Sequence, residues 1–532
     1  MSKENFAKGA AILSLSGLIV KILGAIYRIP LTNLIGTEGM ANYNIAYNVY
    51  NLLLTISLAG LPTAIARLVS EKRALNNYKG AYQVYSISLL TLFVIGMVSS
   101  LLVLLFARPL VNLLHFPNAY YSMLALVPAL LVIPVMSAYR GFFQGAQNMA
   151  PLAMSQFLEQ LLRVIVGYGL AYSLVKIGVN KAAAGATFGA SIGSIGALLI
   201  ILLFFVKRKN LTQSEINSSD NNFLEEPKKI VKDLLKIAVP ITIGAAMSPL
   251  MSILDSYFVG SRLTSLGFTQ VQIEDLMGQL GSMAQSLINF PQAFSTAIAV
   301  SLVPVLTEAY VKKDKHRLAQ TADMGAKLSL IIALPSGVGM FMLAQPILGL
   351  LYPGMGEKLA SAGVLLQIQA IGVIFFILNQ AYTAMLQSVN KQMLPVKNLF
   401  FGLIVKVVLS YILVGIKEIN INGAAISSLV AYFVTTVFNL RDIRRYTRIK
   451  MKNIVKIAAL PLLSTALMAI TVWITYNLAR LLITKSNTLL TLLSITAGGL
   501  IYFVALFATG AITREDLELI PMGSKLKRFV RR

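Results

Sequence analysis

The chain is a succession of apolar segments, each about 20 residues long, separated by short polar turns. A helix of that length crosses the roughly 30 Å hydrocarbon core of a bilayer. Because backbone polar groups must be satisfied within the membrane, uninterrupted apolar runs of this length indicate helices. We count about fourteen. Composition agrees, since 56% of the 532 residues are hydrophobic and 13% are charged, unlike ordinary soluble domains. The sequence predicts an all-α integral membrane protein with about fourteen transmembrane helices.

The longest polar connector, residues 207–233, divides this series of helices. It is rich in Asn, Ser, Lys and Glu, a composition typical of segments that build no core of their own. We interpret it as a cytoplasmic linker. Residues 1–206 and 234–446 then form two bundles of six helices each, and residues 447–532 contain two extra helices and a basic cytoplasmic tail.

The two halves repeat each other weakly at corresponding places. Thr63-Ala64-Ile65-Ala66 recurs as Thr296-Ala297-Ile298-Ala299, and Gln144 and Gln387 each precede a polar turn and a proline. Counting nineteen residues on from each Gln reaches Arg163 and Lys406. Because each half holds an even number of spans, this repeat predicts a pseudo-twofold axis along the membrane normal.

The net charge of +25 follows the membrane topology. With the amino terminus in the cytoplasm, about 31 Lys and Arg fall in inner loops and tails and about 8 in outer loops. The sequence therefore predicts a multi-pass protein of the bacterial plasma membrane with both termini cytoplasmic. The basic clusters at 312–317, 441–456 and 525–532 favour contact with anionic lipids. We expect no nucleic-acid partner.

Cations predominate among the charges within or bordering the spans, and such groups must face protein or water. Lys21, Arg163 and Lys406 lie farthest from the span ends, whereas Arg67 and Arg140 could simply extend to the interface. Glu159 precedes Arg163 by one helical turn and could merely neutralise it. A cavity with surplus positive charge suits an anion. The candidate substrate-binding residues are Lys21, Arg28, Arg67, Arg140, Glu159, Arg163 and Lys406.

Asp255 is the candidate for ion coupling. It lies within a span and has no basic residue three or four positions away. Such a carboxylate either takes up a proton or binds a cation, and both couple transport to a gradient. The alternative is a salt bridge to Lys21, Arg28 or Lys406. We expect no cofactor beyond possible coupling to Na⁺ or H⁺.

Other residues bear on mobility and chemistry. Prolines inside spans, Pro249 among them, free carbonyl groups that are tolerated only beside a cavity or another helix. Gly185, Gly189 and Gly193 recur every four residues and predict close helix packing. The sequence Gly-Ala-Ser-Ile-Gly from Gly189 resembles a hydrolase elbow, but no strand precedes it. Cysteine is absent, and we find no Walker loop. We predict that the protein is not an enzyme and has no metal site.

Several segments resemble a known family. They are VKILGAIYRIPLTNLIGTEGMANYNIAYNVYNLLLTISLAGLPTAIARLVSEKRA, FFQGAQNMAP, FLEQLLRV and QMLPVKN. These are similar to stage V sporulation protein B and its polysaccharide-biosynthesis relatives, in the multidrug, oligosaccharidyl-lipid and polysaccharide exporter superfamily. The resemblance covers nearly the whole chain. It implies two six-helix bundles around a central cavity, alternating access, and movement of a polyprenyl-pyrophosphate-linked sugar across the plasma membrane, in cell-wall synthesis or sporulation.

Lipid II, the peptidoglycan precursor, is the first expectation for the substrate, and we expect a monomer. Lipid II flippases of the superfamily have two arginines around a Leu-Gly pair, and here Lys21 and Arg28 flank Leu23-Gly24. Those relatives also have an arginine after Asn-Leu-Leu, whereas here Leu54 follows Asn51-Leu52-Leu53.

Three alternatives remain open. The protein could export another lipid-linked polysaccharide unit, or it could be a cation-coupled multidrug exporter, which would need carboxylates in its cavity. A membrane-embedded glycosyl or phosphoryl transferase would need clustered carboxylates for a metal or a base. The surplus of cations favours the lipid-linked substrate.

Overall fold

The computed structural model describes residues 3–219, 224–447, 454–482 and 486–512, and all regular structure in these ranges is helical. The prediction of an all-α membrane protein is confirmed. The predicted basic tail at 525–532 lies outside the described residues. Contacts divide the chain into two compact units, residues 1–264 with 268–278 and residues 265–267 with 279–532.

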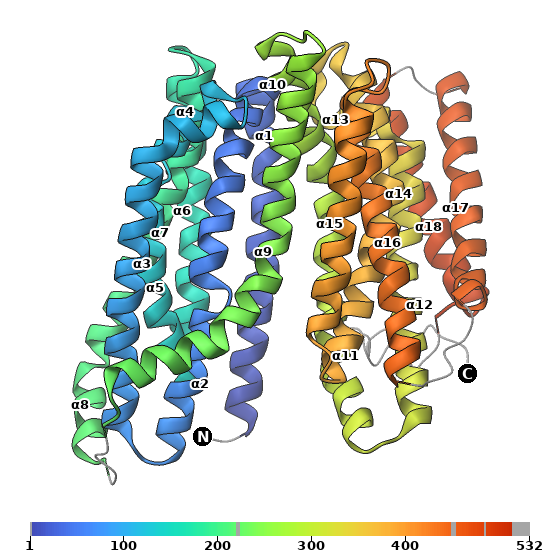
Figure 1. The fold of residues 1–532 in the computed structure, drawn as a ribbon. Helices are drawn as coiled ribbons and strands as arrows, with labels where there is room; N and C mark the ends of the chain where they lie inside the picture. Colours follow the sequence, from blue (N-terminus) through green and yellow to red (C-terminus); the bar gives the residue numbers. More distant parts are fainter. Residues whose placement is uncertain (1–2, 220–223, 448–453, 483–485, 513–532) are drawn as a thin grey trace. The chain divides into compact units, whose positions relative to one another are not determined.

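The first unit, drawn in blue to green in Figure 1, contains ten α-helices and one 3₁₀ turn. They are α1 (Lys3–Leu58), α2 (Leu61–Ala74), α3 (Tyr78–Leu113), η1 (Pro117–Ala119), α4 (Tyr120–Leu124), α5 (Val127–Gly145), α6 (Ala150–Leu174), α7 (Val179–Lys207), α8 (Lys209–Asn217), α9 (Pro227–Ser265) and α10 (Gln270–Gly278).

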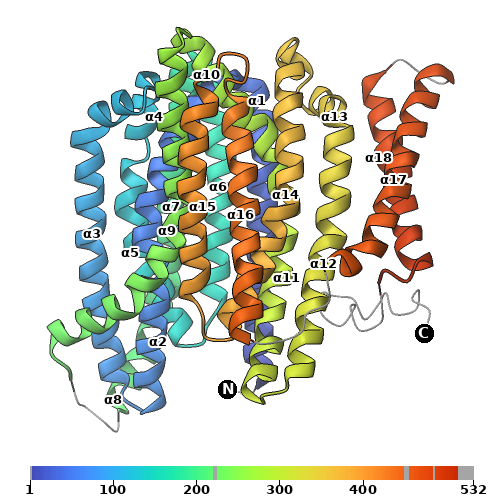
Figure 2. The same cartoon turned by 45° about the vertical axis from the view of Figure 1, so that its right-hand side comes forward.

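The second unit begins with a π-helical turn and contains the remaining helices. They are η2 (Gln279–Ala284), α11 (Gln285–Val311), α12 (Lys315–Met342), α13 (Ala344–Leu351), η3 (Pro353–Met355), α14 (Lys358–Ser388), α15 (Met393–Val414), α16 (Asn422–Thr447), α17 (Ile454–Leu482) and α18 (Asn487–Ala508). The last two run side by side, as Figures 1 and 2 show, and Tyr502 of α18 donates to the carbonyl of Ile331 on α12 at 2.6 Å.

Twelve segments in the described residues are long and apolar enough to cross a membrane. The predicted number of about fourteen is approximate. Helix α6 is not among the twelve, because Glu159, Gln160 and Arg163 lower its hydropathy. Its 25 residues are about 37 Å long at 1.5 Å per residue, enough to span. Two of these three residues, Glu159 and Arg163, are candidate substrate-binding residues predicted from the sequence.

Helix α1 joins what the sequence predicts as two separate spans. The helical backbone conformation of α1 is interrupted at Gly36, which has φ 71° and ψ 178°. A side chain at positive φ is strained, so glycine suits this position. The turn between the two spans is therefore a single non-helical residue instead of a loop, and a second break, at Ala59 and Gly60, separates α1 from α2.

The internal repeat is visible in helix packing. A Cβ on Gly185 of α7 would lie 3.1 Å from Cβ of Leu170 on α6, and one on Gly423 of α16 would lie 2.7 Å from Cβ of Leu413 on α15. Leu170 and Leu413 are separated by the same interval as Gln144 and Gln387. The pair α6–α7 thus recurs as α15–α16. The pseudo-twofold axis stays a prediction.

Contacts group α9 and α10 with the first unit, although the predicted boundaries assign residues 234–446 to the second bundle. Gly60 packs directly against the backbone of Ala238 on α9, and a Cβ on Gly260 would lie 2.7 Å from the carbonyl oxygen of Leu114. A sequence repeat and a contact unit are different divisions of the chain, so the predicted boundaries stay a prediction.

The predicted linker is partly helical and docks on the turn between α2 and α3. Arg73 holds Glu215 through two hydrogen bonds of 2.8 and 3.1 Å, and Lys72 pairs with Glu225. The hydrogen bond from Arg73 lowers the pKa of Glu215, and that from Lys72 lowers the pKa of Glu225. Gln83 also donates to the carbonyl of Glu225 at 2.7 Å. Ionic contacts at Glu215 and Glu225 therefore attach a segment that builds no core of its own.

Candidate substrate-binding site

A buried ion-pair cluster joins α5 and α6 in the first unit. Arg140 Nη2 lies 2.9 Å from Glu159 Oε2, and Arg163 Nη2 lies 3.1 Å from Glu159 Oε1. Their side chains are 13%, 15% and 16% exposed in the order Arg140, Glu159, Arg163. One carboxylate serves two guanidinium groups, so the cluster keeps one positive charge in surplus.

The sequence left open whether Glu159 merely neutralises Arg163. The expected pair does form, but Arg140 shares the same carboxylate and also donates through Nε to Ser155 Oγ at 3.0 Å. Glu159 therefore does not neutralise the two arginines completely. Charge taken out of water is costly unless it is fully paired, and charges interact more strongly where water is excluded. The cluster can attract an anion.

The glycine seam predicted on α7 fixes the position of α6. A Cβ on Gly189 would lie 2.6 Å from the carbonyl oxygen of Arg163, and one on Gly193 would collide with the carbonyl oxygen of Glu159. The prediction of close packing at Gly185, Gly189 and Gly193 is confirmed. Small residues let the two backbones approach, and this approach sets where the charged side chains emerge.

Helix α1 presents one face to Arg163 and another to α9. Tyr43, Tyr47 and Tyr50 follow at helical spacing, with ring centroids 5.4 and 5.2 Å apart in sequence order. Tyr47 accepts a hydrogen bond of 2.7 Å from Arg163 Nη1, and the guanidinium carbon lies 5.8 Å from the ring centroid. An arginine on an aromatic face gains cation–π attraction. The cluster is thereby tied to α1.

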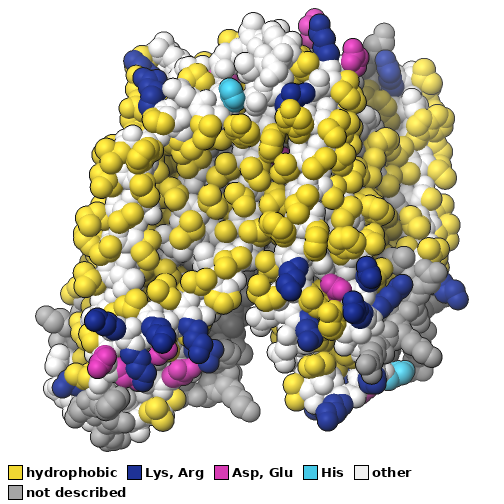
Figure 3. Space-filling view, in the orientation of Figure 1, with side chains coloured by type: hydrophobic (Ala, Val, Ile, Leu, Met, Phe, Trp, Pro, Cys, Tyr) yellow, Lys and Arg dark blue, Asp and Glu magenta, His cyan; other side chains and the backbone are white. Residues whose placement is uncertain are grey.

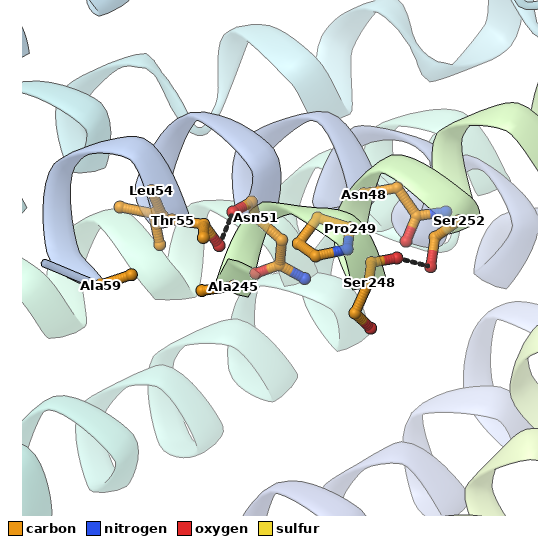
Figure 4. A pocket seen from close by; sticks show the side chains of 9 residues that line it. All are labelled: Asn48, Asn51, Leu54, Thr55, Ala59, Ala245, Ser248, Pro249 and Ser252. Atoms are coloured by element: carbon orange, nitrogen blue, oxygen red, sulfur yellow. Dashed lines mark hydrogen bonds between the residues drawn. The ribbon is translucent and has the colours of Figure 1, made fainter. Parts of the chain in front are cut away.

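An uncharged pocket with polar and apolar walls lies between α1 and α9 (Figure 4), and Asn48, the residue after Tyr47, belongs to its lining. Its volume is ≈ 400 Å³. Small-molecule sites span about 300 to 1,000 Å³, so the pocket has room for an organic group. It is lined by Asn48, Asn51, Leu54, Thr55 and Ala59 of α1 and by Ala245, Ser248, Pro249 and Ser252 of α9.

Pro249 explains part of the polarity of the pocket. A proline inside a helix cannot donate to the carbonyl four residues earlier, which here belongs to Ala245. Ala245 and Pro249 both line the pocket. Of the two surroundings expected for such prolines, a cavity or another helix, Pro249 has a cavity. No lining side chain is charged, so the walls offer only amide, hydroxyl and carbonyl groups.

Comparison with known proteins identifies the family. The model of the family "Polysaccharide biosynthesis protein" matches residues 6–310. The chain belongs to this family. A second model, named MatE, matches residues 280–412. The chain is therefore a member of the exporter superfamily expected from its motifs.

Three similar proteins of this family and superfamily cover nearly the whole chain. The lipid II flippase MurJ of Bacillus subtilis is 26% identical over 99% of this chain and 98% of its own length. Stage V sporulation protein B of the same organism is also 26% identical, over 99% of both chains. The solved structure titled "Lipid II flippase MurJ, inward closed conformation" has a TM-score of 0.68 and 17% identity, covering 93% of this chain and 98% of that one. The shared fold is thus that of flippases and exporters.

The pocket is neutral at the position after Asn51-Leu52-Leu53, where the resemblance leads us to expect an arginine. Leu54, which follows Asn51-Leu52-Leu53, is one of the pocket-lining residues. The departure seen in the sequence therefore lies in the pocket wall itself. Two arginines of the same unit, Arg140 and Arg163, share Glu159, and Arg163 contacts Tyr47 of α1.

Asp255 lies near the pocket on α9. It is half-buried and follows Ser248 and Ser252 at seven and three residues, on the same side of the helix. The next residue, Ser256, accepts a hydrogen bond of 3.4 Å from Asn48. Lys406 is buried in α15 of the second unit, with 7% exposure. Its role and that of Asp255 stay predictions.

Three further predicted site residues, Arg67, Arg28 and Lys21, lie on α1 and α2. Arg67 is 65% exposed and pairs with Glu71 on its own helix at 2.8 Å. Arg28 is half-buried on α1. Lys21 belongs to the same helix, but its side chain lies outside the described residues. The roles of these three cations stay predictions.

Sequence reasoning missed the pocket walls and Tyr47. Asn48, Asn51 and Thr55 are spaced so that they share one face of α1, and this polar stripe within an apolar span was a usable signal. Tyr47 had none, because its significance depends on Arg163, which lies on another helix.

Proposed function

We propose that the protein is a flippase that moves a polyprenyl-pyrophosphate-linked sugar precursor across the bacterial plasma membrane by alternating access, and that lipid II is its substrate. The proposal rests on one observation. Consecutive residues of α1 connect the two parts of the site: Tyr47 contacts Arg163, and Asn48 lines the neutral pocket.

The chemistry of such a substrate matches both parts. A pyrophosphate is an anion and is held best by arginine, whose planar group donates in pairs to phosphate oxygens. Sugar hydroxyl groups both donate and accept, as do the Asn, Thr and Ser side chains in the pocket. The relatives named as lipid II flippase and stage V sporulation protein B support the same substrate class. They are transporters, and we propose that this chain has no catalytic activity.

The distribution of charge supports an orientation. Figure 3 shows an apolar surface over the middle of each unit, with many Lys and Arg side chains at its lower end. Cytoplasmic loops carry an excess of Lys and Arg, so we place that end, and both termini, in the cytoplasm. The same side chains can contact anionic headgroups. We propose that the protein acts as a monomer.

Depletion of the protein tests the proposal. If it is the flippase for lipid II, depletion should cause lipid II to accumulate on the cytoplasmic leaflet, as measured by extraction and mass spectrometry after labelling in intact cells. Accumulation of a different polyprenyl-linked saccharide would point to another polysaccharide unit. If no lipid-linked precursor accumulated, the proposed function would be wrong.

The match to the MatE model over residues 280–412 favours one alternative, a cation-coupled drug exporter. Purified protein in liposomes distinguishes the two functions. The flippase should expose labelled lipid II to an external reagent and leave cationic dyes inside, whereas the exporter should do the reverse.

A further inference from the structure

Helix α10 is attached to the first unit through a buried carboxylate, Glu274. Gly278 at the end of α10 packs directly against Thr37 of α1, one residue after the break at Gly36, and Figure 1 shows α10 near the upper end of α1. The Glu274 side chain is only 3% exposed. Among the described residues, the contacts of Glu274 and Gly278 involve no residue of the candidate substrate-binding site.

The two oxygens of Glu274 are unequally satisfied. Oε1 accepts hydrogen bonds of 2.9 Å from Asn118 Nδ2 and of 2.9 Å from Gln270 Nε2. Oε2 has a single contact, of 3.4 Å, with Asn42 Nδ2. A buried carboxylate oxygen with one long hydrogen bond has lost its water without adequate replacement.

No basic side chain compensates this charge within the described ranges. The ion pairs found there do not include Glu274. The charged neighbour that acts on it is Glu38, one turn before Asn42 on α1, and this second carboxylate makes the site more negative. A positive charge beside Oε2 would therefore stabilise the Glu274 carboxylate.

The hydrogen-bonding atoms of the Asn42 amide are also unequally satisfied. It is completely buried, and its Nδ2 is shared between Glu274 Oε2 at 3.4 Å and Asn180 Oδ1 at 3.2 Å. Its own Oδ1 has no hydrogen-bond partner among the described residues. A half-turn of this amide exchanges its nitrogen and oxygen. The Asn42 oxygen then takes the place of the nitrogen, next to Glu274 Oε2 and Asn180 Oδ1.

We propose that Glu274, Asn42 and Asn180 bind a monovalent metal cation, sodium in the first instance, that links α10, α1 and α7. Carboxylate and amide oxygens are ligands for hard cations. One carboxylate in the ligand set balances one positive charge. Calcium takes six to eight oxygens, often from several carboxylates, and no group of three Asp, Glu, His or Cys suited to a metal occurs among the described residues.

The cation would fix α10 to the first unit. The chain leaves α10 directly into η2 and α11 of the second unit, so α10 is a connecting element as well as a packed one. The site is separate from the proposed function, because it would exist whatever substrate the protein moves. The alternative is a protonated Glu274 that donates from Oε2 and needs no metal.

Thermal unfolding of the full-length protein in detergent tests the site without any transport measurement. The unfolding midpoint is compared in NaCl, KCl and choline chloride at equal ionic strength and pH 7. A ligand that binds only the folded state raises the midpoint with its concentration. We expect the midpoint to rise with NaCl concentration relative to choline chloride, and KCl to show whether potassium also binds.

Two variants locate the effect. Glu274→Gln should abolish the sodium-dependent rise, while Glu357→Gln, at an exposed carboxylate of the second unit, should keep it. Asn180→Ala retains the carboxylate and provides the same test if Glu274→Gln does not fold. The proposal is overturned if the wild type shows no sodium-specific rise, or if the rise survives both Glu274→Gln and Asn180→Ala. A midpoint that responds to pH but not to sodium would assign the proton instead.

Discussion

Substitution of Arg163 is the most direct test of the proposed substrate site. Its two Nη atoms donate to Tyr47 and Glu159, while Nε has no hydrogen-bond partner among the described residues. This buried donor has lost water without gaining a partner, and the cluster around it carries surplus positive charge. Under the proposed function, an anion that reached the cluster would find a donor to pair with.

We expect Arg163→Gln to abolish complementation in cells that depend on the protein. Loss of a charge-assisted hydrogen bond to pyrophosphate costs about 1.5 to 3 kcal/mol. Glutamine substitutions at Lys21 and Lys406 test the other two deep cations in the same assay. Full activity of all three single variants would contradict a role for cations in transport.

Stability must be separated from transport at this position. Arg163→Gln leaves Glu159 paired with Arg140, whereas Glu159→Gln leaves both guanidinium groups without their carboxylate. We therefore expect Glu159→Gln to destabilise by about 3 to 5 kcal/mol, Arg163→Gln to destabilise less, and Arg67→Gln, at an exposed pair, to change the free energy of unfolding by about 1 kcal/mol or less. If Arg163→Gln proves as unstable as Glu159→Gln, its loss of complementation cannot be assigned to substrate binding.

Asp255 tests ion coupling. If it couples transport to a gradient, Asp255→Asn should bind substrate but lose the dependence of turnover on the sodium or proton gradient, measured in liposomes with imposed gradients. If it is a structural partner, the variant should be less stable, and neutralising the partner cation should restore stability. Turnover that keeps its full gradient dependence would remove the coupling role.

At the scale of elements, the contact of α6 with α7 determines where the cluster lies. Gly193→Ala forces a Cβ into the carbonyl oxygen of Glu159, and overpacking of this kind costs about 1 to 3 kcal/mol. Gly169→Ala, on α6, meets nothing within 4 Å and should stabilise the helix by up to about 1 kcal/mol. Thermal unfolding of the two purified variants measures the difference. Equal stability would contradict the close packing.

The docked linker makes a pH-dependent contribution. Pairing lowers the pKa of Glu215 and Glu225, so its stabilisation is present above the pKa of free glutamate, about 4.3, and is lost as the pH falls through the lowered values. Hydrogen exchange of α8, corrected for intrinsic rates, should be slow at pH 7 and become faster only as the pH falls well below about 4. In Glu215→Gln it should already be fast at pH 7. The exposed neighbour Glu226→Gln serves as control, and unchanged protection in Glu215→Gln would contradict the docking.

At the scale of the whole molecule, the orientation can be tested by labelling. Cysteine is absent from the chain, so single substitutions report unambiguously. In intact cells, Asn217→Cys on α8 should be protected from an impermeant thiol reagent, and Glu357→Cys, next to α14, should react. Glu357 is preferable to Gly356, whose φ of 51° would strain a cysteine. Labelling at Asn217 would reverse the proposed topology.

The sequence by itself determined which segments are helices, since a spanning helix satisfies its own backbone and is marked by a local run of apolar residues. It also determined the glycine seam and the pair of Glu159 with Arg163, which depend on spacing within one segment, and the family, which depends on motifs spread along the chain. Composition did not show that Glu215 and Glu225 of the linker meet Arg73 and Lys72, because it does not reveal which charges meet across the fold.

Only the tertiary structure decided which side chains from different helices meet. Arg140 shares Glu159 across a turn, Tyr47 reaches Arg163 from another helix, and Asn42, Asn180 and Glu274 converge from three helices. Periodicity fixes the faces of a helix but neither its rotation nor its neighbour, which follow from close packing of side chains over the whole unit. A site built from single residues of several helices therefore exists only once those helices have packed.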